Sequence, residues 1–138
     1  PTTFLKEQGA NAVEDLSNLF DWRENACRAI FYISDEELDG CCPERANGNP
    51  AELAHETAEV ELAITAALDN NVAVFSHLID SNSLDPAIFD LYQRLSDETF
   101  GLHKTSLPNE VNNTFYIDLL PEVICNSCNA CSLNDLIQ

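Results

Sequence analysis

Two runs of mostly apolar residues dominate the hydrophobic pattern, and both predict β-strands. The first run covers residues 27–34 and the second covers residues 72–79. Apolar and polar positions do not alternate in either run, which is typical of strands buried on both faces of a parallel sheet. A shorter and weaker strand is expected at residues 102–107, so the pattern predicts three strands.

Apolar residues at helical spacing between these runs predict four helices. They are expected at residues 12–21, 51–69, 86–98 and 110–124. Asn11 is expected to cap the first helix, with Glu14 three residues later completing a capping-box-like pair. Pro50 follows Asn49 and is expected to open the second helix. The connection over residues 35–50 is longer than most loops, which favours a functional or cross-linked segment.

The order helix, strand, helix, strand, helix, strand, helix predicts an α/β fold. Parallel strands joined by right-handed helical crossovers give a Rossmann-like, three-layer α/β/α arrangement with a mostly parallel sheet. A chain of 138 residues is long enough for one domain with a core. We expect residues 1–124 to form this domain and residues 125–138 to form a Cys-rich tail.

The charge of the chain is strongly negative and limits its partners. Twenty-four acidic residues against 6 basic ones give a formal net charge of -18. This charge repels nucleic acid and anionic membranes, and it suits cation binding or a solvated acidic surface. No apolar run approaches the ~20 residues that a membrane span needs, so no membrane insertion is expected. The sequence begins at Pro1 without Met, which we interpret as a processed product or a piece of a longer chain.

Four carboxylates follow the first predicted strand within five positions: Asp35, Glu36, Glu37 and Asp39. Ligands of open α/β sheets bind outside the carboxyl ends of the strands, so this is the best candidate site. Dense oxygen ligands suit Mg²⁺ or Ca²⁺. The alternative is a solvated acidic loop that binds nothing.

The six cysteines favour disulfide bonds and an oxidising compartment, so we expect a secreted or cell-surface protein. They are Cys27, Cys41, Cys42, Cys125, Cys128 and Cys131. A link from Cys41 or Cys42 to the tail would close the long loop, and Cys27 is expected to stay buried and free. The alternative is a zinc or iron–sulfur site at Cys125, Cys128 and Cys131, because thiolates at this spacing can converge on one ion. Zinc is the less favoured cofactor.

Enzyme motifs are not evident in this sequence, and we expect a protein that is not an enzyme. No Gly-rich nucleotide-binding motif or P-loop occurs. Ser34, His77 and Asp80 are the residue types of a hydrolase triad, but no nucleophile-elbow sequence supports that combination.

Several phrases of the sequence resemble von Willebrand factor type A domains. Arg28 to Glu36 resembles the family's strand that ends in a metal-site aspartate, and residues 51–79 resemble the next helix and strand. Residues 91–107 resemble the following helix and Gly-turned strand, and residues 110–125 resemble the last helix. Gly9 to Glu14 stands where the family has a Gly-rich loop carrying another metal-site residue. The likeness covers the carboxyl-terminal part of such a domain.

The resemblance implies a binding or adhesion module that grips a protein partner through a divalent cation. Asp35 matches the family's aspartate, Asn11 stands in place of the loop Thr or Asp, and Glu36 replaces the usual Gly. The family's opening strand with Asp-x-Ser-x-Ser has no match in this sequence. The resemblance therefore implies either a fragment of such a domain or an incomplete domain that another chain completes in an oligomer or complex. The alternatives are a disulfide-linked subunit of a surface layer or filament, and a Cys-ligated zinc or iron–sulfur protein.

Overall fold

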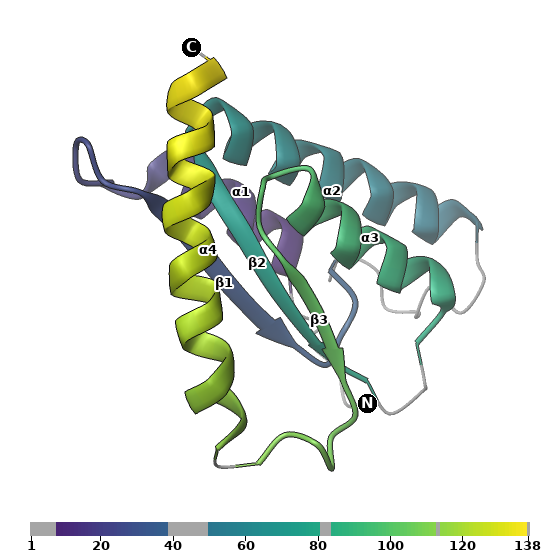
Figure 1. Ribbon diagram of the computed structural model, residues 1–138. Helices are drawn as coiled ribbons and strands as arrows, with labels where there is room; N and C mark the ends of the chain where they lie inside the picture. Colours follow the sequence, from purple (N-terminus) through teal and green to yellow (C-terminus); the bar gives the residue numbers. More distant parts are fainter. Residues whose placement is uncertain (1–7, 39–49, 81–83, 113, 138) are drawn as a thin grey trace.

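The computed structural model describes residues 8–38, 50–80, 84–112 and 114–137, the last eight of these by their backbone (Figure 1). In this part of the chain, helices and strands alternate. They are α1 (Gly9–Leu19), β1 (Arg28–Ser34), α2 (Pro50–Asp69), β2 (Val72–Ile79), α3 (Pro86–Asp97), β3 (His103–Ser106) and α4 (Phe115–Ile137). The alternating order predicted from the sequence is confirmed.

The three described strands form one parallel sheet in the order β1-β2-β3. The register places Arg28 beside Val72 and Ser34 beside Leu78, and it places Ser76 beside His103. β2 lies in the centre and is buried over nearly its whole length, as its unbroken apolar run predicts. An α/β fold with a parallel sheet is therefore confirmed.

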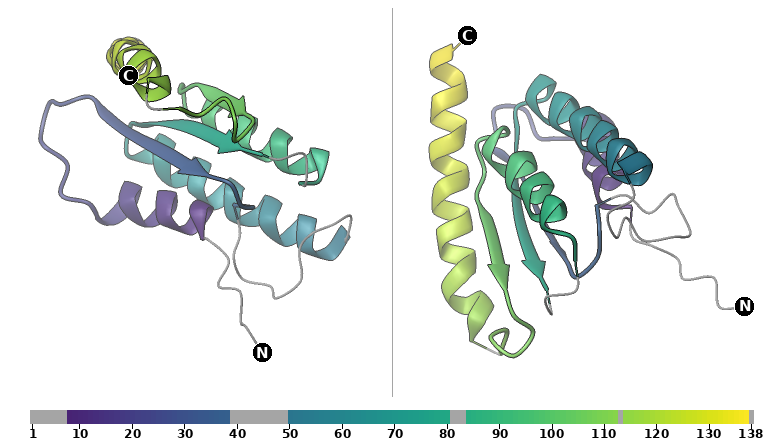
Figure 2. Two further views of the ribbon diagram at one scale, coloured as in Figure 1. Left: turned by 90° about the horizontal axis from the view of Figure 1, so that it is seen from below. Right: turned by 90° about the vertical axis from the view of Figure 1, so that its right-hand side faces the viewer.

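Helices cover both faces of the sheet (Figure 2). α1, α2 and α3 pack on one face, where Val13, Val60 and Leu95 meet β-strand residues that include Ile30 and Val74. Among the described residues, the other face carries α4 alone. There, a smaller cluster joins the β2 side chains Ala73 and Phe75 to Leu119 and Val123 of α4. The three layers are therefore unequal, because one helix supplies all of the second layer that the structure describes.

The turn from α3 to β3 depends on two local features. α3 begins with Asp85, whose side chain accepts a hydrogen bond from the Ala87 amide at 2.9 Å. The helix is followed by Phe100, which has a left-handed backbone with φ of 61°. A Cβ atom at the next residue, Gly101, would collide with the carbonyl oxygen of Val74. Only glycine allows the chain to pass this close to β2.

Two helix boundaries differ from the sequence prediction. α1 begins at Gly9, and Asn11 lies inside it rather than capping it. The Ala10 amide instead donates to the carbonyl oxygen of Leu38 at 2.8 Å, so a distant segment replaces the side-chain cap.

The last helix also differs, because it begins at Phe115 and passes through residue 125 to end at Ile137. Residues 125–137 contain no Gly or Pro that would stop a helix, so the expected end at Ile124 is wrong. None of the helices in the described ranges is long and apolar enough to cross a membrane.

Candidate functional site

The loop that follows β1 is held in place by three helices. Leu38 is fully buried, and its amide donates to the Glu56 carboxylate of α2 at 2.8 Å. Its carbonyl oxygen accepts from Ala10 of α1, as described above. The Tyr92 hydroxyl of α3 donates to the carbonyl oxygen of Glu36 at 2.7 Å. This loop therefore presents its acidic residues on a fixed backbone at the carboxyl edge of the sheet.

The predicted metal ligands are only partly placed by the structure. Asp35 is exposed just beyond β1, while Glu36 and Asn11 are half-buried. Because the start of α1 is bonded to Leu38, Asn11 lies at the same edge as Asp35. Asp39 lies outside the described residues. Within the described ranges, no group of three or more His, Cys, Asp or Glu side chains is arranged to hold a metal ion, so the cation site stays a prediction.

The burial of Glu56 was missed in the sequence. Helical spacing puts this residue largely off the apolar face of its helix and so predicts exposure, but the side chain is only 2% exposed and this expectation is wrong. Glu37, one of the four carboxylates after the first strand, is also buried at 4% exposed. The partner of Glu56, the Leu38 amide, lies 18 residues earlier in the chain. No local pattern signals such a contact, because it exists only once the loop has folded back on α2.

The cysteines occupy two described regions. Cys27 is exposed and takes part in a disulfide bond, so the expectation that it stays buried and free is wrong. Cys125 and Cys128 are exposed on α4, and Cys125 carries a free thiol. Cys41, Cys42 and the side chain of Cys131 lie outside the description. The described thiols alone therefore do not form a metal site.

The residues of a hydrolase triad are not brought together. Ser34 stands beside Leu78 in the sheet register, and His77 stands beside Ile33. Because successive side chains of a strand point to opposite faces, Ser34 and His77 lie on different faces of the sheet. The Ser34 hydroxyl instead accepts a hydrogen bond from the Glu36 amide at 3.0 Å.

His77 is fully buried between the sheet and α4. Its ring stacks on Phe115 with 4.8 Å between ring centroids, and its Nδ1 atom lies 3.2 Å from the Tyr116 hydroxyl. Its Nε2 atom has no hydrogen-bond partner in the described residues. Burial, followed by the nearby charges of His103 and Lys104, lowers the pKa of His77. Packing of α4 on the sheet therefore favours the neutral form of the His77 imidazole.

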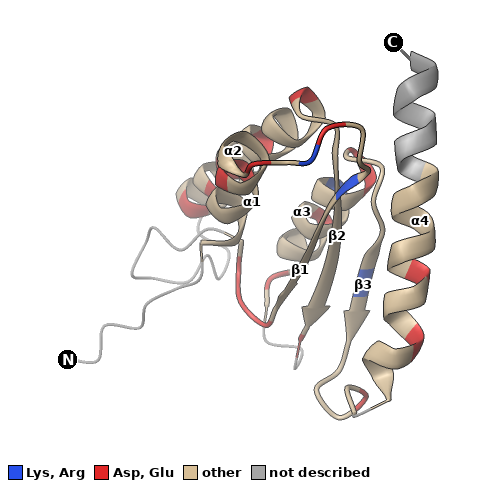
Figure 3. Ribbon diagram, turned by 90° about the vertical axis from the view of Figure 1, so that its left-hand side faces the viewer, with Lys and Arg blue, Asp and Glu red and all other residues tan. Residues whose placement is uncertain are grey.

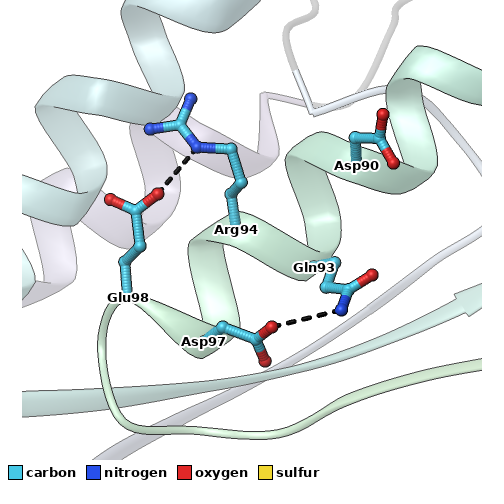
Figure 4. Close-up of a pocket in the computed structure, with 5 residues that line it drawn as sticks. All are labelled: Asp90, Gln93, Arg94, Asp97 and Glu98. Atoms are coloured by element: carbon cyan, nitrogen blue, oxygen red, sulfur yellow. Dashed lines mark hydrogen bonds and ion pairs between the residues drawn. The ribbon is translucent and has the colours of Figure 1, made fainter.

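A hollow on the outer side of α3 does not have the features of a binding site (Figure 4). It is lined by Asp90, Gln93, Arg94, Asp97 and Glu98. The Arg94 guanidinium pairs with Glu98 at 2.7 Å and with Glu61 at 2.6 Å, and these hydrogen bonds raise its pKa. Gln93 donates to Asp97 at 3.2 Å. Most of these polar groups satisfy one another, so the hollow is a helix surface rather than a convergent binding site.

The two edges of the sheet are unlike each other. β1 has seven residues and pairs with β2, and no other described strand pairs with its outer edge. Residues 29–34 of this edge carry no charge. β3, at the opposite edge, has four residues and includes Lys104. Short, charged edge strands discourage pairing with other chains, whereas long uncharged ones invite it.

Exposed apolar side chains flank the outer edge of β1 on the face covered by α4. Lys104 of β3 lines a hollow with Asp118 and Glu122, which fixes the side of α4 that faces β3. At 100° per residue, Leu120 and Ile124 project from the other side, toward β1. Neither is covered in the described structure.

The opposite face has a matching pair on α1. α1 is the outermost helix of its layer, because it packs against α2 and β1. Asn18 accepts a hydrogen bond from Asn70 at the end of α2, so that side of α1 faces α2. Leu16 lies about 160° from Asn18 around the helix and projects from the other side, while Leu19 is the last and most exposed residue of α1. We call the outer edge of β1 and its exposed neighbours the β1 surface, which comprises Leu16, Leu19, Ile33, Leu120 and Ile124. Their exposed fractions range from 41% at Ile33 to 77% at Leu19.

Charge is distributed asymmetrically along this edge. Figure 3 views the molecule from the side of β1 and shows a basic residue at the start of the strand and acidic residues beyond its end. The basic residue is Arg28, and the acidic ones are Asp35, Glu36 and Glu37. The end of the edge beyond Ser34 is therefore acidic. Arg28 places a basic side chain at the other end, after a loop that carries Asp21, Arg23 and Glu24.

Comparisons with models of protein families, with curated proteins and with solved structures found no match. We therefore infer the function of this chain from its geometry, and above all from the β1 surface.

Proposed function

We propose that this chain is a non-enzymatic binding module of von Willebrand factor type A character, which works outside the cell in adhesion or assembly. It binds a further polypeptide chain along the outer edge of β1. The single observation that carries the proposal is the β1 surface, a long strand edge without charge over residues 29–34 and with exposed apolar side chains on both faces of the sheet.

An unpaired strand edge with exposed apolar side chains on both faces is unfavourable in water. An edge strand offers backbone hydrogen-bonding groups to another chain, and an added strand is a common mode of protein recognition. Contiguous exposed apolar residues mark interaction sites more often than isolated ones do. The Cys27 disulfide supports an oxidising compartment.

Photo-crosslinking tests this function. A photo-crosslinking amino acid replaces Ile33 on β1, and a matched variant carries it at Leu62, which is 50% exposed on α2 and distant from β1. After irradiation under native conditions, we expect polypeptide adducts from position 33 and few from position 62. Equal adduct yields at the two positions would contradict the proposal.

A divalent cation at the strand end is a second element of the proposed function. Its support is the hydrogen bond from Ala10 to Leu38, which holds the start of α1 against the loop carrying the acidic residues. Asp35 would provide the central ligand, with Asn11, Glu36 and Asp39 as further oxygen donors. Mg²⁺ and Ca²⁺ prefer such ligands, and a partner's carboxylate would complete the coordination.

A further inference from the structure

We infer that the chain bound at the β1 surface is a second copy of this protein, related by a two-fold axis that makes the two β1 strands neighbours and antiparallel. This inference rests on the proposed function, because it names the occupant of the same edge. Joining the two sheets in this way gives one continuous six-stranded sheet, since each copy contributes its three described strands.

The first argument is the position of the apolar side chains. Leu16 and Leu19 lie on one face of the sheet, and Leu120 and Ile124 lie on the other. A single added strand lies in the plane of the sheet and leaves these helix residues largely in water. A second copy brings its own α1 and α4 to the same levels. The apolar side of α1 then meets the same side of the other copy's α1, and α4 likewise meets α4, as an isologous interface requires.

The second argument is the charge along the edge. Arg28 begins β1, and Asp35 follows its end. An antiparallel register centred on Phe31 sets Arg28 of one copy beside Ser34 and Asp35 of the other, and the two-fold axis repeats this contact. A parallel neighbour of the same sequence would place like charges together, and such pairs are unfavourable.

The proposed dimer is also a closed assembly, to which no further copy adds. The two-fold axis uses the β1 edge of both copies and leaves the two β3 edges outside. β3 is short and carries Lys104, so these edges are poor templates for further strands. A closed dimer follows rather than an open fibre.

The net charge of -18 opposes this association, so the conditions of the test matter. Screening reduces the repulsion between copies, because the Debye length is about 8 Å at 0.15 M salt and about 3 Å at 1 M. We expect the dimer to be measurable at physiological ionic strength and in the micromolar range.

Sedimentation equilibrium of the purified chain tests the inference. We expect the wild-type protein to reach twice the monomer mass as its concentration rises. Ile33→Lys places a charge in the interface, and we expect its dissociation constant to rise at least tenfold. Leu62→Lys adds the same charge on α2 and should dimerise like the wild type. Electrophoresis without reductant excludes dimers made by intermolecular disulfides.

A charge swap tests the antiparallel orientation. Asp35→Arg should weaken the dimer, because it brings two positive groups together, and adding Arg28→Glu should restore it. The Arg28 guanidinium also donates to the Asn70 carbonyl oxygen at 2.8 Å, so circular dichroism checks that the Arg28→Glu single variant folds. Loss of dimer in the double variant, with both single variants folded, would overturn the antiparallel arrangement.

The two proposals fail in different ways. A wild-type chain that stays monomeric at all concentrations overturns the second-copy inference. If position 33 then crosslinks to a different polypeptide, the proposed function stands. If position 33 crosslinks to nothing, both proposals are wrong.

Discussion

Single side chains decide how the loop after β1 is held. The Leu38 amide is buried and its acceptor is the Glu56 carboxylate. A buried amide that loses its acceptor loses the full hydration of that group without compensation, at a cost of about 1–3 kcal/mol. This hydrogen bond therefore makes Glu56 matter for stability, although glutamate is normally exposed.

We expect Glu56→Ala to lower the free energy of unfolding by about 1–3 kcal/mol. Glu56→Gln keeps an oxygen acceptor and should cost less. Glu59→Ala, on the same helix, should change stability by about 0.5 kcal/mol or less, as most surface substitutions do. Urea unfolding monitored by circular dichroism measures all three variants. An Ala variant at position 56 that is as stable as the wild type would show that the Glu56 bond contributes nothing.

The attachment of α4 to the sheet depends on few side chains. In the described part of the chain it is the one helix on its face of the sheet, with Leu119 and Val123 as buried apolar contacts. The remaining contacts are aromatic, and His77 lies at their centre between Phe115 and Tyr116. Protonation would place a charge in this cluster, next to His103 and Lys104. We therefore expect the docking of α4 to depend on pH.

The direction of this pH dependence follows from the pKa of His77. Its folded-state pKa lies below the value of about 6.5 for an exposed histidine. As the pH falls below about 6.5, the unfolded chain binds the proton first, so the free energy of unfolding decreases. The contribution is complete above about pH 6.5 and is lost as the pH falls toward the folded-state pKa. Burial lowers the pKa of His103 as well, so it acts in the same direction.

We expect hydrogen exchange of the amides at residues 115–129 to speed up between pH 7 and pH 5 relative to the intrinsic rate. His77→Phe keeps an aromatic ring against Phe115 and removes the titration, so it should flatten this dependence. His55→Gln, on the exposed side of α2, should leave it unchanged. If the Phe variant shows the same acceleration as the wild type, His77 is not the group responsible.

For the molecule as a whole, the net charge of -18 sets the response to ions. Mutual repulsion destabilises a compact state, and salt reduces this effect by screening. A cation bound at a specific site adds stability by mass action, about 1.4 kcal/mol when its concentration is roughly ten times the dissociation constant. The two effects separate when solutions of equal ionic strength are compared.

We expect Mg²⁺ or Ca²⁺ to raise the unfolding temperature by a few degrees more than NaCl of equal ionic strength. Asp35→Asn should remove the extra increase while leaving the fold intact. Asp69→Asn makes the same charge change at the last residue of α2, near the amino end of β2, and should retain the extra increase. Calorimetric scans measure these shifts, and an extra increase that survives Asp35→Asn would rule out Asp35 as a ligand.

The linear pattern was sufficient for the elements and their order. Mostly apolar runs identified β1 and β2, but only β2 is buried over nearly its whole length. β1 is an edge strand in which only Ile30 and Ser34 are buried, so the expectation that it is buried on both faces is wrong. Helical spacing identified α2 and α3, and their alternation with strands predicted the parallel sheet. The position of Asp35 just beyond β1 was also predictable, since the carboxyl end of a buried strand marks one edge of the sheet.

Only the tertiary structure decided which segments of the chain lie next to each other. The cap of α1 is a carbonyl group from residue 38, and the acceptor for Leu38 is a carboxylate from α2. The β1 surface combines side chains from α1, β1 and α4 that are far apart in the chain. Sequence periodicity describes one element at a time, so it reports which side chains share a face of that element. It carries no information on which faces meet, because that depends on the packing of the whole core.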